Sequence, residues 1–551
     1  MLRRWLFILL SILIGFLIIF YIVVDNYVEP ILRDRLHTLI IKGSDSLYTY
    51  TLGKLKTNFF NGNVEVENLQ ISLDSNRYEY LRQRNSLPPL TMDFSLRKGY
   101  IKGVGIFSLL FGKKIRVDEI MSKDADVKLS RHIRKNIEVQ EREPVWKAMR
   151  PKIESIYIGK IKLEGIKLLY KNSDTSEAVK LKFERCDALF KDIRIDSASA
   201  VDSSRIGFTK SIKLRFNDLK FRTEDSLYKM KAQEISFSSD DRSLEVDSFK
   251  LQTTIEKEDV YKRLAHQASL YYIEFNKVHL VNVRLDHFIY NNTIDPDSIL
   301  FESPDIDIYN DRSYPLNYQS KVGKYPQQEL LKIPSTIIIK AIRFNKGKII
   351  YTEKNPKTSG EGVITIDDLD LLARNVTNDS VKIKHDPEMY AQATARLFGT
   401  SPIAANFTFY LDSLNGRYDA NGNIKNVTFS QLNGLSIPLA NVQINSLNLN
   451  DLEFSVKAGD YDAIGNIKMH YRDLALTLNK TDEETGETKK RKFVTKVLNK
   501  YVIRPSNPAP DGTDKMATNV KVARLTTEAF FGLLWKTIFA GMEQIMMKTG
   551  H

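Results

Sequence analysis

The sequence predicts a mainly β protein, and three observations support this fold class. Between residues 53 and 480, short stretches alternate apolar and polar residues, which is the pattern of strands with one dry and one wet face. Turn signals punctuate these stretches at Asn61-Gly62, Asn421-Gly422 and Asn433-Gly434. Helical patterns are few in this range, and the three short ones cover residues 105–114, 144–152 and 258–272. We therefore expect roughly 18–22 antiparallel strands of ordinary length.

The strands carry a recurring irregularity, in which two polar residues instead of one separate two pairs of apolar residues. In VEVENLQISL, Val64 and Val66 precede Leu69 and Ile71. Further full copies cover residues 161–168, 214–221, 244–251, 278–285, 364–371 and 442–449. A β-bulge or a tight bend inserts one such extra residue, so both apolar pairs can face the same side of a sharply curved sheet. Two very short strands joined by a tight turn are the alternative.

The dry face of so many strands needs a cover. Stacked sandwiches would bury these faces against one another, whereas a long curved sheet would leave an apolar groove that needs an apolar ligand. Because no Pro-, Gly- or Ser-rich linker precedes residue 480, the sequence marks no boundary between sandwich domains. The pattern alone leaves both architectures open.

The N-terminus predicts a membrane anchor. Residues 5–24 contain no charged side chain, and at about 1.5 Å per residue a helix of this length crosses the ~30 Å hydrocarbon core of a bilayer. Two arginines precede the segment and an acidic residue follows it, which places the N-terminus in the cytoplasm. The segment lacks the small residues of a signal-peptide cleavage site. We therefore expect an uncleaved anchor over residues 1–27, with the rest of the chain on the far side.

Helical and irregular segments flank the strand region. Apolar residues three and four apart predict an amphipathic helix over residues 28–52. A charged loop, a helix over residues 493–503 and the linker RPSNPAPDGTD are expected within residues 481–524.

The last segment, residues 525–551, is expected to form an amphipathic helix with Thr526 or Thr527 as its N-cap. Lys536 and Glu543 interrupt its apolar positions, so it suits an interfacial helix or a plug over the end of a sheet better than a membrane span. The candidate membrane-interface residues are Phe530, Phe531, Leu534, Trp535, Ile538 and Phe539.

Composition and motifs argue against several classes of function. The formal charge of +13 comes from 81 Lys and Arg against 68 Asp and Glu, and its thin spread suits an anionic membrane, nucleic acid or an ordinary solvated surface. The single cysteine, Cys186, allows no intramolecular disulfide. The chain contains no nucleophile elbow, zinc-protease motif or nucleotide-binding motif, and its eight histidines are scattered. We therefore expect no enzyme, no catalytic residue, no metal site and no cofactor.

A family resemblance lies in residues 1–170 and 360–480. A signal anchor precedes the hairpin NGNVEVENLQISL, and IKGVGIFSLLFGKKIRVDEIMSKDADVKL then combines a short apolar helix with a strand that ends in x-A-D-V-x-L. These features resemble the AsmA-like proteins of the Gram-negative envelope, relatives of TamB and, more distantly, of chorein-type bridge-like lipid-transfer proteins. The family commonly has a proline where this chain has Ala125-Asp126.

The resemblance implies an elongated, taco-shaped β-groove over residues 53–480, with an apolar lining and a few short capping helices. It implies an anchor in the inner membrane and a location in the periplasm of a Gram-negative bacterium. The implied function is to bind phospholipid acyl chains and to support lipid transport or outer-membrane assembly, together with an outer-membrane or periplasmic protein and without nucleic acid. The alternative is a non-enzymatic envelope scaffold of stacked sandwiches that holds no lipid.

The residues implied to line the groove are the apolar positions of the recurring pattern. They are Val64, Val66, Leu69, Ile71, Ile161, Leu163, Ile166, Leu168, Leu214, Phe216, Val278, Leu280, Ile364, Ile366, Leu369, Leu371, Val442, Ile444, Leu447 and Leu449.

Overall fold

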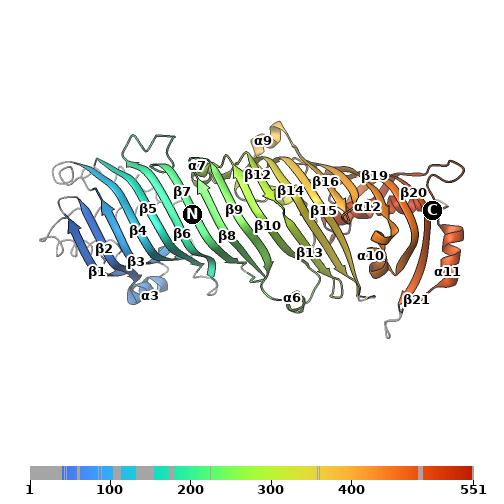
Figure 1. The fold of residues 1–551 in the computed structure, drawn as a ribbon, viewed down its shortest axis with the longest axis horizontal. Helices are drawn as coiled ribbons and strands as arrows, with labels where there is room; N and C mark the ends of the chain where they lie inside the picture. The colour runs from blue at the N-terminus through green and yellow to red at the C-terminus, as the bar shows by residue number, and fades with distance from the viewer. Residues whose placement is uncertain are drawn as a thin grey trace. The chain divides into compact units, whose positions relative to one another are not determined.

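The computed structural model describes residues 40–41, 44, 46–58, 62–84, 86–88, 90–103, 113–131, 154–172, 179–223, 225–356, 358, 360–481 and 488–548. The protein is mainly β, as predicted, and long, mostly antiparallel strands pair into one large sheet (Figure 1). Stacked sandwiches would require separate sheets instead. The expected anchor over residues 1–27 lies outside the described residues. Among the described ones, no helix is long and apolar enough to cross a membrane.

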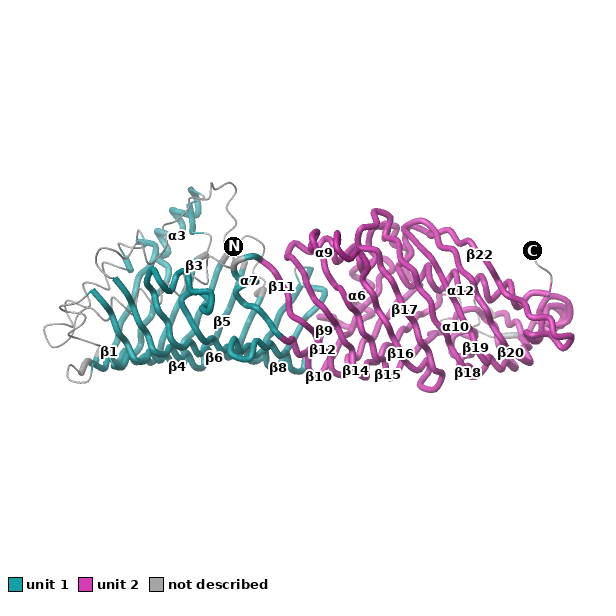
Figure 2. Tube along the Cα trace, turned by 90° about the horizontal axis from the view of Figure 1, so that it is seen from above, with its two compact units in different colours: residues 1–248, 282–291 teal, residues 249–281, 292–551 magenta. Residues whose placement is uncertain are grey.

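The chain divides into two compact units (Figure 2). Unit 1 comprises residues 1–248 and 282–291, and unit 2 comprises residues 249–281 and 292–551, so one boundary falls inside strand β9 (Ser243–Thr253). The other elements of unit 1 are β1 (Tyr48–Asn58), β2 (Asn63–Leu73), α3 (Ser75–Gln83), β3 (Leu90–Lys102), β4 (Lys114–Arg131), β5 (Ser155–Asn172), β6 (Val179–Ile195), β7 (Thr209–Arg222), β8 (Tyr228–Ser238) and α7 (Leu285–Asn291).

Unit 2 holds most of the helices that the structure describes. Its first half contains α6 (Lys257–Leu264), β10 (Ser269–Val281), β11 (Thr293–Ile294), β12 (Ser298–Glu302), β13 (Asp305–Asp311), α8 (Pro326–Leu331), β14 (Thr336–Lys354), β15 (Glu361–Thr377) and α9 (Ser380–His385). Its second half contains β16 (Glu388–Leu397), β17 (Ser401–Tyr410), β18 (Tyr418–Thr428), α10 (Phe429–Ala440), β19 (Val442–Ala458), β20 (Asp462–Thr481), β21 (Thr488–Lys490), α11 (Lys492–Val497), the π-helical turn η2 (Leu498–Val502), β22 (Met516–Ala523) and α12 (Phe530–Met546).

Two parts of the strand ladder are parallel, and the expectation of a wholly antiparallel sheet is wrong there. β4 pairs with β5 in parallel, with Ile120 beside Ile161. β14 runs parallel to β11, β12 and β13 and antiparallel to β15. Parallel neighbours need a connection that carries the chain back along the sheet. Between β13 and β14, residues 312–335 with α8 form this connection.

The recurring irregularity of the sequence corresponds to β-bulges. In five copies the second polar position has a positive φ of 51–67°, and these residues are Asn68, Gly165, Asp218, Ser248 and Asp368. In the first copy Val64, Val66 and Leu69 are all buried. One residue in the left-handed region therefore keeps both apolar pairs on the same face, which confirms the predicted bulge.

Two copies differ from this pattern. At Asn282 (φ 57°) the chain leaves the sheet, because β10 ends at Val281 and α7 begins at Leu285. This copy is therefore a bend and not a bulge. In the copy at residues 442–449, the pairing with β20 shifts register after Ile444 and β19 has no residue with a positive φ.

The same backbone feature recurs in strands where the sequence pattern did not reveal it, at Asp124, Asp192, Lys346, Asn375, Asn426, Asp473 and Asn519. Glycine, asparagine and aspartate suit these positions because most side chains clash with the backbone in the left-handed region. Neighbouring side chains also cap the bulged N–H groups. The Oδ1 atoms of Asp187, Asp370 and Asn466 accept from the N–H of Gly165 (2.8 Å), Lys346 (3.2 Å) and Asn519 (2.9 Å), respectively.

Asp218→Val tests the bulges directly. The substitution should lower the free energy of unfolding by about 1–2 kcal/mol, because a β-branched side chain is disfavoured at a φ of 54°. Asp218→Gly should cost little, since glycine adopts this conformation freely. Urea unfolding of both variants measures the difference. Equal losses in the two variants would mean that the carboxylate, and not the backbone conformation, stabilises the bulge.

Two of the predicted turns are wrong. Asn421-Gly422 lies inside β18, and Asn433-Gly434 lies inside α10. Gly422 allows close packing instead of a turn, since a Cβ there would lie 2.4 Å from the Ala404 carbonyl oxygen and 2.7 Å from the Phe454 ring. The Asn433 side chain joins α10 to β19, because its Oδ1 accepts from the Ile444 N–H at 2.7 Å.

The helix predictions agree with the structure in part. Residues 48–52 belong to β1, and the segment 258–272 is helical only to Leu264, because β10 follows. Residues 105–112 and 144–152 lie outside the described residues. The helix over 493–503 is confirmed as α11 with η2.

The C-terminal region differs from its prediction in two details. α12 begins at Phe530 with Ala529 at the N-cap position, in place of the expected Thr526 or Thr527. The expected linker is a packed loop. Asn507 is 1% exposed, and its side chain donates to the Met469 carbonyl oxygen at 2.8 Å.

Candidate functional site

Unit 2 carries a row of four phenylalanines on one face of its sheet. Phe249 stacks on Phe275 with ring centroids 4.5 Å apart. Phe275 contacts Phe301 edge-on at 5.6 Å, and Phe301 contacts Phe344 in the same way at 5.0 Å. The register continues the row to Leu371, which lies opposite Phe344. All five side chains are half-buried, so part of each remains accessible.

Aliphatic side chains extend this row along the strands. They lie opposite one another in the register, as Ile299 does with Ile342 and Ile349 with Ile366, and they are also half-buried. We refer to the whole set as the apolar wall: Phe249, Phe275, Leu280, Ile299, Phe301, Ile306, Ile308, Ile342, Phe344, Ile349, Ile364, Ile366 and Leu371.

The same face of the sheet becomes covered further along unit 2. Directly paired residues share a face, and the pairing leads from Leu371 through Ala393, Ala405 and Gly422 to Phe454. Phe454 belongs to a continuous buried core with residues of β18, β19, β20 and α12. α12 therefore covers the apolar face of these strands. Ile299 and Ile342 of the apolar wall pack against this core, and all residues of the wall remain half-buried.

The docking of α12 depends on two glycines. A Cβ on Gly541 would lie 2.5 Å from the Cδ1 atom of Ile467 in β20, and a Cβ on Gly465 would lie 2.7 Å from the Thr537 methyl group. Ile467 and Thr537 are both fully buried. The helix and the strand approach so closely because neither contact position carries a side chain.

Phe530 anchors the beginning of α12 in an aromatic cluster. Its ring lies 4.7 Å from that of Tyr418, 5.6 Å from that of Phe409 and 5.7 Å from that of Tyr325. These rings come from β17, β18 and the N-cap position of α8, so the cluster ties α12 to both the sheet and a preceding helix.

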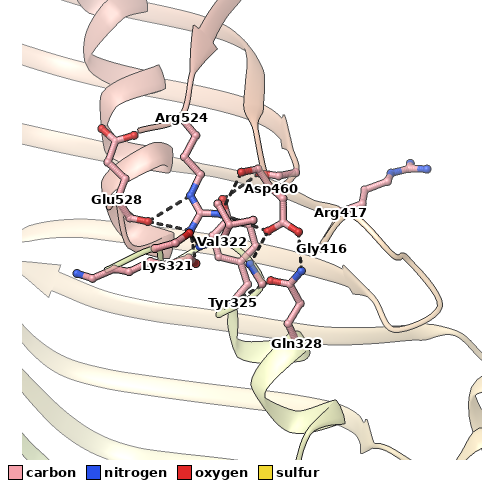
Figure 3. Close-up of polar contacts among 12 residues, drawn as sticks. Lys321, Val322, Tyr325, Gln328, Gly416, Arg417, Asp460, Arg524 and Glu528 are labelled. Atoms are coloured by element: carbon pink, nitrogen blue, oxygen red, sulfur yellow. Dashed lines mark hydrogen bonds and ion pairs between the residues drawn. The ribbon is translucent and has the colours of Figure 1, made fainter. Parts of the chain in front are cut away.

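A buried ion pair locks the same corner (Figure 3). The Arg524 guanidinium donates to Oδ1 of Asp460 at 3.2 Å, and the two side chains are 1% and 7% exposed. It also donates to the carbonyl oxygens of Lys321 at 2.7 Å and Glu528 at 2.8 Å. Its Cζ lies 4.2 Å from the centre of the Tyr325 ring. We call this group of residues the clasp.

Further hydrogen bonds satisfy the carboxylate of the clasp. The Gln328 side chain donates to Oδ2 of Asp460 at 2.8 Å, and the Gly323 N–H donates to Oδ1 at 3.2 Å. Both charged partners of the buried pair are thus fully hydrogen-bonded, which is the condition for such a pair to stabilise a fold. The clasp is structural, because it joins the α8 segment, the β19–β20 turn and the start of α12.

The opposite face of the sheet is polar. In unit 1, Glu119 of β4 lies between Lys160 (2.8 Å) and Lys102 (3.7 Å) on neighbouring strands. The hydrogen bond from Lys160 lowers the pKa of Glu119. In unit 2 a shallow cavity of about 630 Å³ is lined by polar residues that include Arg343 and Asp370, and also by Phe344 and Leu371 of the apolar wall.

Asp307 on β13 is a carboxylate whose charged form is disfavoured in the folded protein. Burial raises its pKa, the neighbouring Asp305 adds to the effect, and its Oδ1 is buried without a hydrogen-bond partner. Because the pKa of Asp307 is higher in the folded than in the unfolded state, ionisation of this carboxyl lowers the free energy of unfolding. The loss begins as the pH rises past the unfolded-state pKa and is complete above the folded-state pKa. Asp307→Asn should therefore stabilise the protein at pH 7 but not at pH 3. Thermal unfolding at the two pH values measures this, and an equal gain at both would contradict the assignment.

The structure places the predicted lining residues in two environments. Fully buried are Val64, Val66, Leu69, Ile161, Val278, Leu369, Ile444, Leu447 and Leu449. Half-buried are Ile71, Leu163, Ile166, Leu168, Leu214, Phe216, Leu280, Ile364, Ile366, Leu371 and Val442. Ile444, Leu447 and Leu449 belong to the core that includes α12. These three are covered by protein and are not accessible to a ligand.

Unit 1 brings several predicted residues together. Cys186 of β6 lies opposite Ile166 on one side and opposite Phe216 on the other. Phe216 also contacts Phe183, with ring centroids 4.9 Å apart. Burial raises the pKa of Cys186 to about 12, so the thiol is an unreactive packing residue.

The predicted membrane-interface residues divide between the two faces of α12. Phe530, Leu534 and Ile538 are buried in the core of unit 2. Phe531, Trp535 and Phe539 recur every fourth residue on the outer face and are 69%, 51% and 44% exposed. α12 therefore packs on the sheet by one face and keeps an accessible aromatic row on the other, and its role at a membrane interface stays a prediction.

Sequence reasoning missed most of the aromatic row. Phe249 lies in the copy at residues 244–251, and Phe275 lies in IEFNKVHL, a further copy at residues 273–280 that overlaps the one at 278–285, whereas Phe301 and Phe344 lie in no complete copy. The usable signal was an aromatic residue in each successive strand. It could not be interpreted without the register, which decides whether such residues are neighbours.

In the described part of the chain, no group of three or more His, Cys, Asp or Glu side chains could hold a metal ion. No family model and no curated protein matches the sequence.

Proposed function

We propose that this chain is an AsmA-like, inner-membrane-anchored periplasmic protein that binds phospholipid acyl chains along its apolar wall and supports lipid transport or outer-membrane assembly. The contrast within unit 2 carries the proposal. One stretch of the apolar face is covered by α12, whereas the apolar wall leaves more than ten large side chains half-buried. A lipid tail is the cover that such a surface favours, because each buried CH₂ contributes ~0.8 kcal/mol.

The mechanism on this proposal needs no catalytic group. Rings and aliphatic side chains offer many equivalent contacts, so a tail would exchange one set for the next without a deep binding site. The polar side chains of the opposite face and the strand ends would stay in water with the lipid head groups. No enzyme activity, cofactor or metal enters this mechanism.

Site-specific photocrosslinking of the full chain in cells tests the proposal. A benzophenone side chain in place of Phe275 or Phe344 should capture phospholipid, which mass spectrometry of the purified protein identifies. Tyr390 lies on the opposite face at 41% exposure and is the matched accessible control. Phe409, 6% exposed beneath Phe530, is the matched buried control and should crosslink to protein. Phospholipid adducts at neither wall position, or equal yields at Tyr390, would overturn lipid binding.

A non-enzymatic scaffold is the second candidate, and the burial of α12 favours it. The helix shows that protein segments can cover this face of the sheet. If the protein is a scaffold, a segment of protein covers the apolar wall as α12 covers the neighbouring strands. The same crosslinkers would then yield peptide adducts at Phe275 and Phe344 and no lipid.

A further inference from the structure

The helical segment 492–502, formed by α11 and η2, is attached to the sheet by one face. The Asn499 side chain accepts from the Leu476 N–H at 2.9 Å and donates to the Leu476 carbonyl oxygen at 2.6 Å. Thr495 Oγ1 accepts from the Leu478 N–H at 3.0 Å. These side chains satisfy the backbone of β20 as a neighbouring strand would, and they fix the orientation of the helix.

The outer face of this segment is apolar, although it meets no part of the described protein that buries it. Phe493 is 80% exposed and Tyr501 is 62% exposed, and Val497 lies between them in sequence at 38%. Aromatic side chains are rarely left this accessible without a partner, and three apolar residues four apart form one continuous row.

Basic side chains lie beside this apolar row. Lys492, Lys496 and Lys500 repeat with the same four-residue spacing and are exposed, and Lys490 and Arg491 precede them. Residues 490–510 contain no acidic side chain. The backbone of Lys548, which is also basic, is joined to this segment by a 2.9 Å hydrogen bond from its N–H to the Val502 carbonyl oxygen. Residues 490–502 are thus cationic, and the acidic residues nearest before them in sequence, within residues 482–487, lie outside the described part of the chain.

We propose that residues 490–502 dock on an anionic phospholipid bilayer. The lysines would pair with lipid phosphates while Phe493 and Tyr501 enter the head-group region, which is the arrangement of an interfacial amphipathic helix. The apolar row decides against nucleic acid, since its valine would face a phosphate backbone without a partner. This surface is distinct from the apolar wall, and it does not depend on lipid being bound there.

A fluorescent probe tests the docking. In the variant Tyr501→Cys, an environment-sensitive dye is attached to the new cysteine. The full chain is kept in solution in phosphatidylcholine nanodiscs. The native Cys186 is buried, and its raised pKa keeps it unlabelled. Vesicles with about a third phosphatidylglycerol should shift the dye emission to the blue, and phosphatidylcholine vesicles should not. The same dye at Val381→Cys of α9, a residue 73% exposed, is the control and should not respond.

Substitutions separate the charge from the apolar row. Lys492→Gln, Lys496→Gln and Lys500→Gln together should weaken vesicle binding by at least about tenfold, because each lysine contributes to the attraction. Lys382→Gln with Lys384→Gln on α9 is the matched charge control and should leave binding unchanged. Phe493→Ser should reduce the blue shift. Circular dichroism confirms that each variant is folded.

Three results would overturn the proposal. They are a dye at position 501 that does not respond to anionic vesicles, equal binding of anionic and neutral vesicles, and a response to a single-stranded oligonucleotide in place of vesicles. Concentration-dependent dimerisation that buries the dye without lipid would assign the surface to a second copy of the chain. Photocrosslinking at the apolar wall is read separately, so the failure of one proposal leaves the other measurable.

Discussion

Arg524→Ala is expected to lower the free energy of unfolding of unit 2 by about 3–5 kcal/mol, because it leaves Asp460 as a buried charge without its cationic partner. The loss also removes the donors to the carbonyl oxygens of Lys321 and Glu528 and the cation over the Tyr325 ring. Urea unfolding followed by circular dichroism measures the change. Hydrogen exchange should show the amides of α12 losing protection first, since the clasp holds the start of this helix.

Two comparisons make the result specific to the clasp. Arg396→Ala removes an exposed pair with Asp368, whose partners are 53% and 70% exposed, and should cost less than about 1 kcal/mol. Arg524→Lys keeps the charge but loses the fork of donors, so its cost should lie between those of the other two variants. A loss below about 1 kcal/mol in Arg524→Ala would show that the buried pair contributes no net stability.

Gly541→Leu is expected to shift α12 away from β20 and loosen its packing, at a cost at the upper end of the roughly 1–3 kcal/mol seen for overpacked cores. The new side chain would overlap Ile467, which is fully buried and cannot move aside. Gly532→Ala in the same helix is the control, because the nearest atom to its Cβ lies 3.8 Å away. This control should be neutral or stabilising by up to about 1 kcal/mol.

Dye binding and proteolysis report the displaced helix. An anilinonaphthalene dye should bind Gly541→Leu more than Gly532→Ala, since a shifted α12 leaves part of the apolar face uncovered. Limited proteolysis should cleave the C-terminal segment of the leucine variant first. Equal stability and equal dye binding in the two variants would mean that the helix is not tightly seated.

The Gly465 contact gives an independent check on the docked helix. Gly465→Ala places a methyl group against the Thr537 methyl, and Thr537→Ser removes that methyl while keeping the hydroxyl, which donates to the Leu533 carbonyl oxygen. The double variant should therefore be more stable than the sum of the two single losses. Simple additivity would place the two residues out of contact.

The local features of this protein could be predicted from the sequence because they depend on neighbouring residues alone. A strand alternates with a period of two, and one extra residue with a left-handed backbone shifts the phase. Asn68, Gly165 and Asp368 mark such positions by residue type as well as by spacing. The helix at 493–503 was predictable for the same reason, since its apolar spacing is local.

The predictions from sequence were wrong where contacts with distant residues decide the local structure. Gly422 follows asparagine as in a turn, yet it lies in the middle of a strand because the Phe454 ring occupies the space of its side chain. Asn507 lies in a segment rich in proline, yet it is buried and hydrogen-bonded to β20. The local sequence indicates a turn in the first case and a linker in the second, and contacts from distant residues override both.

The sequence by itself determined that this is a sheet protein with one apolar face and bulged strands. Only the tertiary structure decided which part of that face is covered, because this depends on pairs of residues that are far apart in the chain. Arg524 meets the Lys321 carbonyl oxygen across 203 residues, and α12 lies against β20 through two glycines on separate elements. An amphipathic pattern shows that a face must be buried, but the partner is chosen by shape and charge, which the local pattern does not contain.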